Sequence, residues 1–129
     1  MVTTAVDGPP LRIDPYDAGC PSRRVLDLVG DRWTVLIVGA LGDETLRFSE
    51  LRRRVGGISQ KMLTQTLRDL ERDGLVSRTV HAEVPVRVEY RLTAAGHELR
   101  GPLQALLDWA VGHYGAVADA QQAFDSRPA

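Results

Sequence analysis

The chain has 129 residues, 43% of them hydrophobic, and a formal net charge of -1. This length suits one compact domain and leaves little room for a second, while the hydrophobic content excludes a generally disordered chain. The average charge hides an asymmetry, because residues 47–91 hold ten Arg or Lys against six Asp or Glu and the rest of the chain holds six against eleven. Positive charge is therefore concentrated in the middle third of the chain, mostly as Arg, which suits bidentate contact with phosphate and guanine.

The segment 1–18 is expected to be a flexible N-terminal stretch. It has no basic start followed by an apolar run, so it does not resemble a signal peptide, and nothing in the chain approaches the length of a membrane span. Cys20 is the single cysteine of the chain. Because it has no partner for a disulfide within the chain, we expect a cytoplasmic protein.

Two short helices are predicted first. Pro21 suits the first turn of a helix that runs to Val29, because the N–H that proline lacks needs no partner there. A second helix follows and ends at Gly42, with an apolar stripe at spacings of three and four residues. The apolar residues of the first helix are Val25, Leu26 and Val29, and those of the second are Trp33, Leu36, Ile37, Ala40 and Leu41.

A third and shorter helix is predicted from the spacing of Phe48, Leu51 and Val55. Ser49 is its expected N-cap, since a hydroxyl there can accept from a free backbone N–H. The pair of glycines at 56 and 57 predicts a turn directly after it.

The helix from Ser59 to about Asp73 has the clearest boundaries in the sequence. Ser59 as N-cap places Ile58 and Leu63 where two apolar side chains form a hydrophobic staple. At the other end Gly74 can take the left-handed conformation that closes a helix. The inward face is expected to carry Leu63, Leu67 and Leu70. The opposite, polar face carries Gln60, Lys61, Thr64, Gln65 and Arg68.

After this helix the apolar period changes to two, which predicts the two strands of a hairpin at about 76–80 and 87–92. Their connection contains Pro85 and is longer than a tight turn, so it should project as a wing. Thr93 then caps a long C-terminal helix, which Pro102 should kink. We expect a frayed tail from Ala123. The apolar residues of this helix are Leu99, Leu103, Leu106 and Ala110.

This order of elements predicts a mainly α fold with a small β-hairpin (α+β), the winged helix-turn-helix with terminal dimerisation helices. In that fold the second helix of the motif enters the major groove of DNA. Two other interpretations stay open from the pattern alone. The polar helix face can simply be solvated, and a three-helix unit with a hairpin can also serve as a protein-interaction module.

Four segments of the chain resemble the HxlR-type regulators, which are relatives of the MarR family. They are CPSRRVLDLVGDRWTVLI at 20–37, RFSELRR at 47–53, ISQKMLTQTLRDLERDGLV at 58–76 and EVPVRVEYRLT at 83–93. The resemblance covers about residues 20–114, and we place the domain at 19–122. It implies a homodimer formed through terminal helices that binds double-stranded DNA at a pseudo-palindromic operator, as a transcriptional regulator and most simply a repressor.

Candidate DNA-binding residues come from three places. The capped helix supplies most of them, and the wing supplies one that would reach minor-groove or backbone phosphates. A basic run on the preceding helix supplies phosphate contacts, although such a run can also be a solvated face. The candidates are Ser59, Gln60, Lys61, Thr64, Gln65, Arg68, Arg87, Arg52 and Arg53.

Cys20 is the one candidate for chemistry. It precedes Pro21 at a helix start, where the helix dipole, Arg23 and Arg24 should favour the thiolate and make it oxidisable. Members of the family that this chain resembles often sense oxidants or electrophiles through a cysteine at this N-terminal position. The alternative is a small buried hydrophobe. With no second cysteine, sensing would need an intersubunit disulfide or a mixed disulfide with a small thiol.

A small lipophilic or aromatic effector bound near the dimer interface is a different means of control. Trp33 and Trp109 could line its cavity, although tryptophans at helical spacing are more often core residues. The three histidines, His81, His97 and His113, form no HxxxH pair and lie near no cysteine, so no metal or other cofactor is expected. No nucleophile with a base, acid pair or phosphate loop is evident, so an enzyme is not expected.

Overall fold

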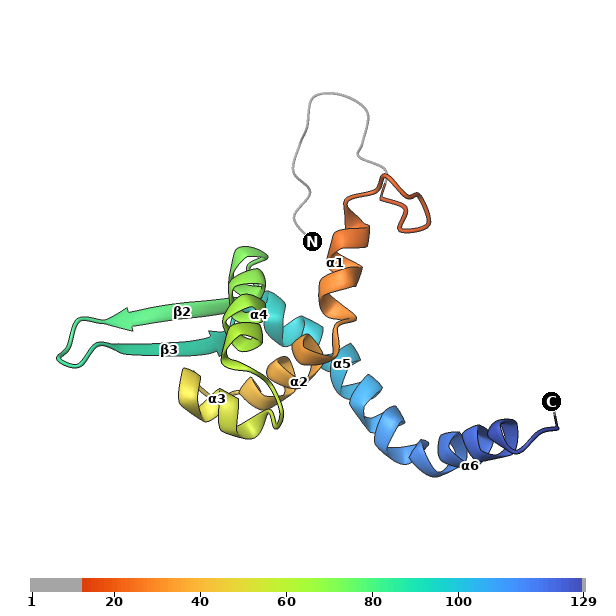
Figure 1. The fold of residues 1–129 in the computed structure, drawn as a ribbon. Coiled ribbons are helices and arrows are strands. Elements are labelled where there is room, and N and C mark those ends of the chain that lie inside the picture. The colour runs from red at the N-terminus through yellow and green to blue at the C-terminus, as the bar shows by residue number, and fades with distance from the viewer. Residues whose placement is uncertain (1–12, 129) are drawn as a thin grey trace, which may run out of the picture.

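The computed structural model describes residues 13–128, so most of the segment expected to be flexible lies outside the described residues. Figure 1 shows the β2–β3 hairpin projecting to one side of helices α2 to α4, while α5 and α6 lead away from the other side. No helix among the described residues is both long enough and apolar enough to cross a membrane. The elements in chain order are α1 Ser22–Val29, α2 Arg32–Leu41, β1 Leu46–Arg47, α3 Phe48–Arg54, α4 Gln60–Arg72, β2 Val76–His81, β3 Arg87–Leu92, α5 Ala94–Gly112 and α6 Tyr114–Asp125.

Helix α2 lies at the centre of the fold and contacts α3, α4, α5 and β3. For that reason it buries more than the single stripe that the spacing predicts. Val35 and Val38 are buried although they lie outside the predicted stripe, and Leu36, which the stripe includes, is 38% exposed. Gly42 ends the helix as predicted, with φ of 51° at the C-cap.

Both ends of α4 form as predicted. The Ser59 hydroxyl accepts a hydrogen bond from the Met62 N–H at 3.0 Å. After Asp73, the Gly74 backbone takes φ of 74°, and the Leu75 N–H donates to the Leu70 carbonyl at 2.9 Å, which is the long bond of a Schellman closure. Ile58, Leu63, Leu67 and Leu70 are all buried.

The start of α3 differs from the prediction, because Ser49 lies inside the helix and Arg47 is the N-cap. Leu46 and Arg47 form a short strand, β1, which pairs antiparallel with β3 and holds the backbone extended up to Arg47. The helix therefore begins at Phe48. The Glu50 carboxylate then accepts from the Arg47 N–H at 3.0 Å.

The predicted hairpin is present and lies in a three-stranded sheet of order β1-β3-β2. Strands β2 and β3 pair antiparallel from Val76 opposite Leu92 to His81 opposite Arg87. Residues 82–86 connect them as the wing. Val84 and Val86 at its tip are exposed.

The C-terminal region forms two helices where one was predicted. Thr93 caps α5 as expected, accepting from the Gly96 N–H at 3.1 Å. The helix continues through Pro102, the position of the predicted kink, and α5 and α6 are divided at His113, between residues 112 and 115, both of which are glycine. Helix α6 reaches Asp125 through a run rich in Ala and Gln, which favour helix, so the tail expected to fray begins within the last turn of α6.

Candidate nucleic-acid interface

The polar face of α4 is open to solvent along most of its length. Gln60, Lys61, Gln65 and Arg68 are exposed, and Thr64 is half-buried. The leucines on the opposite face are fixed in the core, so the helix cannot rotate without opening that core. Ser59 is exposed, and its oxygen already accepts the capping hydrogen bond.

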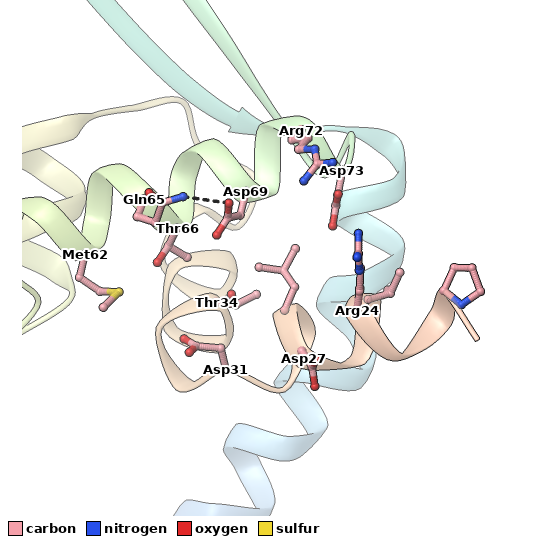
Figure 2. A pocket seen from close by; sticks show the side chains of 13 residues that line it. Arg24, Asp27, Asp31, Thr34, Met62, Gln65, Thr66, Asp69, Arg72 and Asp73 are labelled. Atoms are coloured by element: carbon pink, nitrogen blue, oxygen red, sulfur yellow. Dashed lines mark hydrogen bonds between the residues drawn. The ribbon is translucent and has the colours of Figure 1, made fainter. Parts of the chain in front are cut away.

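Within residues 13–128, Gln65 is the one predicted residue of this face whose side chain has a hydrogen bond to another side chain. Its amide nitrogen donates to the Asp69 carboxylate at 3.1 Å. Contact with a base edge would therefore require that bond to break or to be shared. The same side chain also lines a cleft that α4 forms with α1, seen in Figure 2.

A second groove lies between α4 and the hairpin. Thr64, Leu67, Arg68 and Glu71 of α4 line it together with two hairpin residues that are not among the predicted DNA contacts. These are Arg78 on β2 and Tyr90 on β3, which are paired across the strands. Strand alternation places Arg78 on the same face as buried Val76, so this face continues from the core into the groove. This alternation is the feature of the sequence from which the position of Arg78 could have been predicted. The groove has a volume of about 280 Å³.

Arg87 lies at the base of the wing among acidic groups. Its guanidinium is 3.1 Å from the Glu83 carboxylate and 3.9 Å from that of Glu89, and the side chain is 31% exposed. His81 also contacts Glu89. Arg78, in contrast, is exposed and has no ion pair with any of residues 13–128. In the chain without DNA, the guanidinium of Arg78 is therefore more accessible than that of Arg87.

All three arginines in the run on α3 are exposed, but Arg54 differs from the other two because a carboxylate holds it. Arg52 and Arg53 are exposed. Arg54 is held by Glu44 through a close bond and a second at 3.1 Å, and it also donates to the Ala40 carbonyl at 3.3 Å. This hydrogen bonding lowers the pKa of the Glu44 carboxyl below its ordinary value. Arg54 therefore ties the end of α3 to the segment after α2.

Cys20 is 9% exposed and lies just before α1. Its Sγ is 3.1 Å from the Ser22 hydroxyl oxygen. Hydrogen bonds from the hydroxyl and then the backbone N–H of Ser22 lower the pKa of the thiol, while burial and Asp17 act in the opposite direction. The expected direction is thus present, but its cause is Ser22 and not Arg23 or Arg24. A hollow of about 710 Å³ adjoins the thiol.

The two tryptophans lie in different surroundings. Trp33 is partly buried against the core, with Arg32 over its ring at 4.6 Å. Trp109 is 54% exposed and stacks on His113 at 4.6 Å between ring centroids. The interpretation as a core residue therefore fits Trp33 and fails for Trp109 in the single chain.

The capped helix, the turn before it and the β-hairpin after it define a winged helix-turn-helix protein. A comparison with family models agrees, because the model described as HxlR-like helix-turn-helix matches residues 28–117. The chain belongs to the HxlR-like helix-turn-helix family. It is a helix-turn-helix transcriptional regulator, and such regulators bind DNA.

A related sequence and a related solved structure support this assignment. The chain is 51% identical over 90 residues to the uncharacterised HTH-type transcriptional regulator YtfH of Escherichia coli, covering 70% of this chain and 71% of that protein. The solved structure of the putative transcriptional regulator ytfH from Salmonella typhimurium superposes with a TM-score of 0.81 at 43% identity. That match covers 86% of this chain and 99% of the other.

Two further solved structures concern oxidation. The redox regulator HypR in its oxidised form matches with a TM-score of 0.66 at 39% identity, over 72% of this chain and 96% of that one. Diamide-treated YodB from Bacillus subtilis matches with a TM-score of 0.62 at 38% identity, over 74% and 96% of the two chains. These are properties of the related proteins, and they bear on how Cys20 is interpreted.

Proposed function

We propose that this chain is a sequence-specific repressor that inserts α4 into the major groove of a pseudo-palindromic operator. The observation that carries this proposal is the two-sided α4, with its leucines fixed in the core and its polar face open. Lys61, Thr64 and Arg68 would meet base edges and phosphates from that face, with Ser59, Gln60 and Gln65 beside them. Repression would follow where the operator overlaps a promoter.

The charges around α4 support a role for its neighbours in gripping the DNA backbone. Arg78 and Arg68 line one groove in which they outnumber the single carboxylate, that of Glu71, so one phosphate could lie against both guanidinium groups. Arg52 and Arg53, which are exposed on α3, would contact phosphates beside the helix. Arg87 would contribute only if DNA displaced Glu83 from it, so we propose Arg78 as the stronger contact on the hairpin.

Selection of bound fragments from a random pool of duplex DNA tests this function. We expect one enriched sequence with approximate two-fold symmetry, whose half-sites lie about one helical turn apart. Retention of all sequences alike, with affinity depending on salt only, would show that the chain does not read bases.

We also propose that the chain acts as a homodimer joined through its terminal helices. Helix α5 buries Leu103 and packs Leu107 against the body, but most of the other large apolar side chains beyond Leu103 on α5 and α6 stay open. A second copy with two-fold symmetry would cover them and set the spacing of two α4 helices. The exposed large apolar residues of this region are Leu106, Trp109, Val111, Tyr114, Val117 and Phe124.

Trp109→Glu is expected to weaken dimerisation by at least about 2 kcal/mol, or roughly thirty-fold, because it places a charge in the apolar contact. Sedimentation of the variant across a concentration series measures this change. Gln104→Glu, which adds the same charge on the other side of α5, should leave the dimer intact. Equal dissociation constants for Trp109→Glu and the wild type would show that Trp109 does not lie in the dimer interface.

Redox control through Cys20 is the proposed signal, supported by the lowered thiol pKa and by the similarity to oxidised HypR and diamide-treated YodB. The Cys20 thiolate would add to the N=N bond of diamide. A second thiol, from Cys20 of the partner subunit or from a small thiol, would then attack the Cys20 sulfur. The sulfur–nitrogen bond breaks, a disulfide forms and the hydrazine is released. The oxidation needs no other reagent.

Diamide is therefore expected to weaken operator binding by the wild type at least about ten-fold, and to leave Cys20→Ser unaffected. Gel-shift titrations with and without diamide measure both proteins, and a reducing agent should restore the wild type. If the wild type and Cys20→Ser lose affinity equally, Cys20 is not the sensor.

A further inference from the structure

Tyr90 on β3 lies between the core of the protein and the groove that α4 forms with the hairpin. It packs against the buried core, and the same side chain lines the groove. No hydrogen bond joins the Tyr90 hydroxyl to the rest of residues 13–128, and its oxygen is not enclosed by the protein. The hydroxyl is therefore an open donor, carried by a ring that the core holds.

The charged groups that line this groove favour an anion. Arg68 comes from α4, and Arg78 comes from β2, where it lies directly opposite Tyr90 in the sheet. Glu71 is the one carboxylate among the lining residues, so two positive charges stand against one negative charge. None of these three side chains forms an ion pair within residues 13–128.

The tyrosine and the arginines differ in how freely they move. Arginine side chains are long, and they can follow a phosphate through several positions. A tyrosine has two side-chain torsions, and the ring of Tyr90 is also restrained by its packing against the core. A donor on this ring therefore offers a phosphate oxygen one defined position. Contacts to phosphate fix the register of a protein on the DNA duplex.

We propose that the Tyr90 hydroxyl donates a hydrogen bond to a DNA phosphate that Arg78 also binds, and that this contact sets where the DNA backbone lies against α4. The inference rests on the proposed function of α4 and adds a DNA contact to it. A hydrogen bond to an ionised phosphate oxygen is stronger than one between neutral groups. Because the bond reads no base, it contributes equally on every DNA sequence.

Tyr90→Phe removes the hydroxyl and keeps the ring, so the melting temperature should stay the same. We expect binding to operator and to random DNA to weaken alike, by at least about five-fold. The salt dependence should not change, because no charge is lost, whereas Arg78→Ala should reduce its slope by about one. Tyr16→Phe, which removes a hydroxyl from an exposed tyrosine before α1, is the control and should leave both affinities unchanged.

A double-mutant cycle tests whether the two side chains share one phosphate. The combined loss of affinity in Arg78→Ala with Tyr90→Phe should then be at least about two-fold smaller than the product of the two separate losses. A combined loss equal to that product would show separate contacts and overturn the proposal. A loss for Tyr90→Phe on the operator alone would also overturn it, because the hydroxyl would then contact a base.

The wild type separates this inference from the proposed function. If the wild type enriches no sequence from the random pool, the proposed function fails. If the wild type selects an operator and Tyr90→Phe binds that operator with the same affinity, the role of Tyr90 fails and the proposed function stands.

Discussion

Gly96→Ala is expected to destabilise the protein by about 3 kcal/mol, a large part of the total stability of a domain this size. A Cβ on residue 96 would lie 2.1 Å from the backbone carbonyl oxygen of Leu75 and 3.2 Å from the Leu92 side chain. That carbonyl already accepts a hydrogen bond from the Thr93 N–H at 3.1 Å. Backbone must therefore move, and the connection between α4, the hairpin and α5 moves with it.

Thermal or urea unfolding measures this loss, which corresponds to a fall of about 10 °C in the melting temperature. Gly115→Ala is the matched control, because a Cβ there meets nothing within 4 Å and the position is helical. It should leave stability unchanged or raise it by up to about 1 kcal/mol. Similar stabilities for Gly96→Ala and the wild type would show that α5 does not approach Leu75 so closely.

Arg68→Ala is expected to cost about 1–3 kcal/mol of operator affinity, or roughly five-fold to 150-fold, and clearly less on random DNA. Arg68 is exposed on the polar face of α4, opposite buried Leu63 and Leu70, and no fold contact depends on its charge among residues 13–128. The loss would therefore come from the DNA. Titrations of both DNAs at one fixed salt concentration measure the difference.

Arg91→Ala is the control for Arg68→Ala. It removes the same charge from an exposed position on β3, one residue from Tyr90 and so on the other face of the strand. A small and equal loss on both DNAs is expected for it. If Arg68→Ala behaves in the same way, Arg68 contacts phosphate and does not read a base.

The elements with local signals could be predicted from the sequence. The caps at Ser59 and Thr93 and the closing glycines at 42 and 74 depend on residues close in the chain, and all four are confirmed. The start of α3 depends on β1 pairing with β3, more than forty residues away in the sequence. No local pattern contains that pairing, so the expectation for Ser49 was wrong.

The surroundings of the C-terminal helices explain the other errors. The spacing of apolar residues predicts that a face is buried, but it does not say whether the same chain or another one buries it. For that reason the alternative of a core position, which was left open for Trp109, fails in the single chain, where Trp109 and Leu106 on the same helix are both exposed. The break at His113 lies between two glycines, whereas Pro102, where a kink is predicted, lies inside α5.

The candidate interface divides in the same way. Positions on the polar face of α4 follow from helical spacing, and the structure gives them the expected orientation. Ion pairs between arginines and carboxylates depend on how the chain folds around them. The ion pairs of Arg54 and Arg87 therefore could not be predicted from helical spacing. Arg78 was not predicted as a DNA contact because its position beside Arg68 depends on how the hairpin packs against α4.

Methylation protection of a selected operator tests most directly whether α4 enters the major groove. Dimethyl sulfate modifies guanine N7, which lies in that groove, so bound protein should protect guanines in two patches about 10 base pairs apart, centre to centre. Arg68→Ala should lose protection at the guanine it contacts and keep the rest. Guanine N7 atoms that remain reactive throughout the bound region would contradict the account.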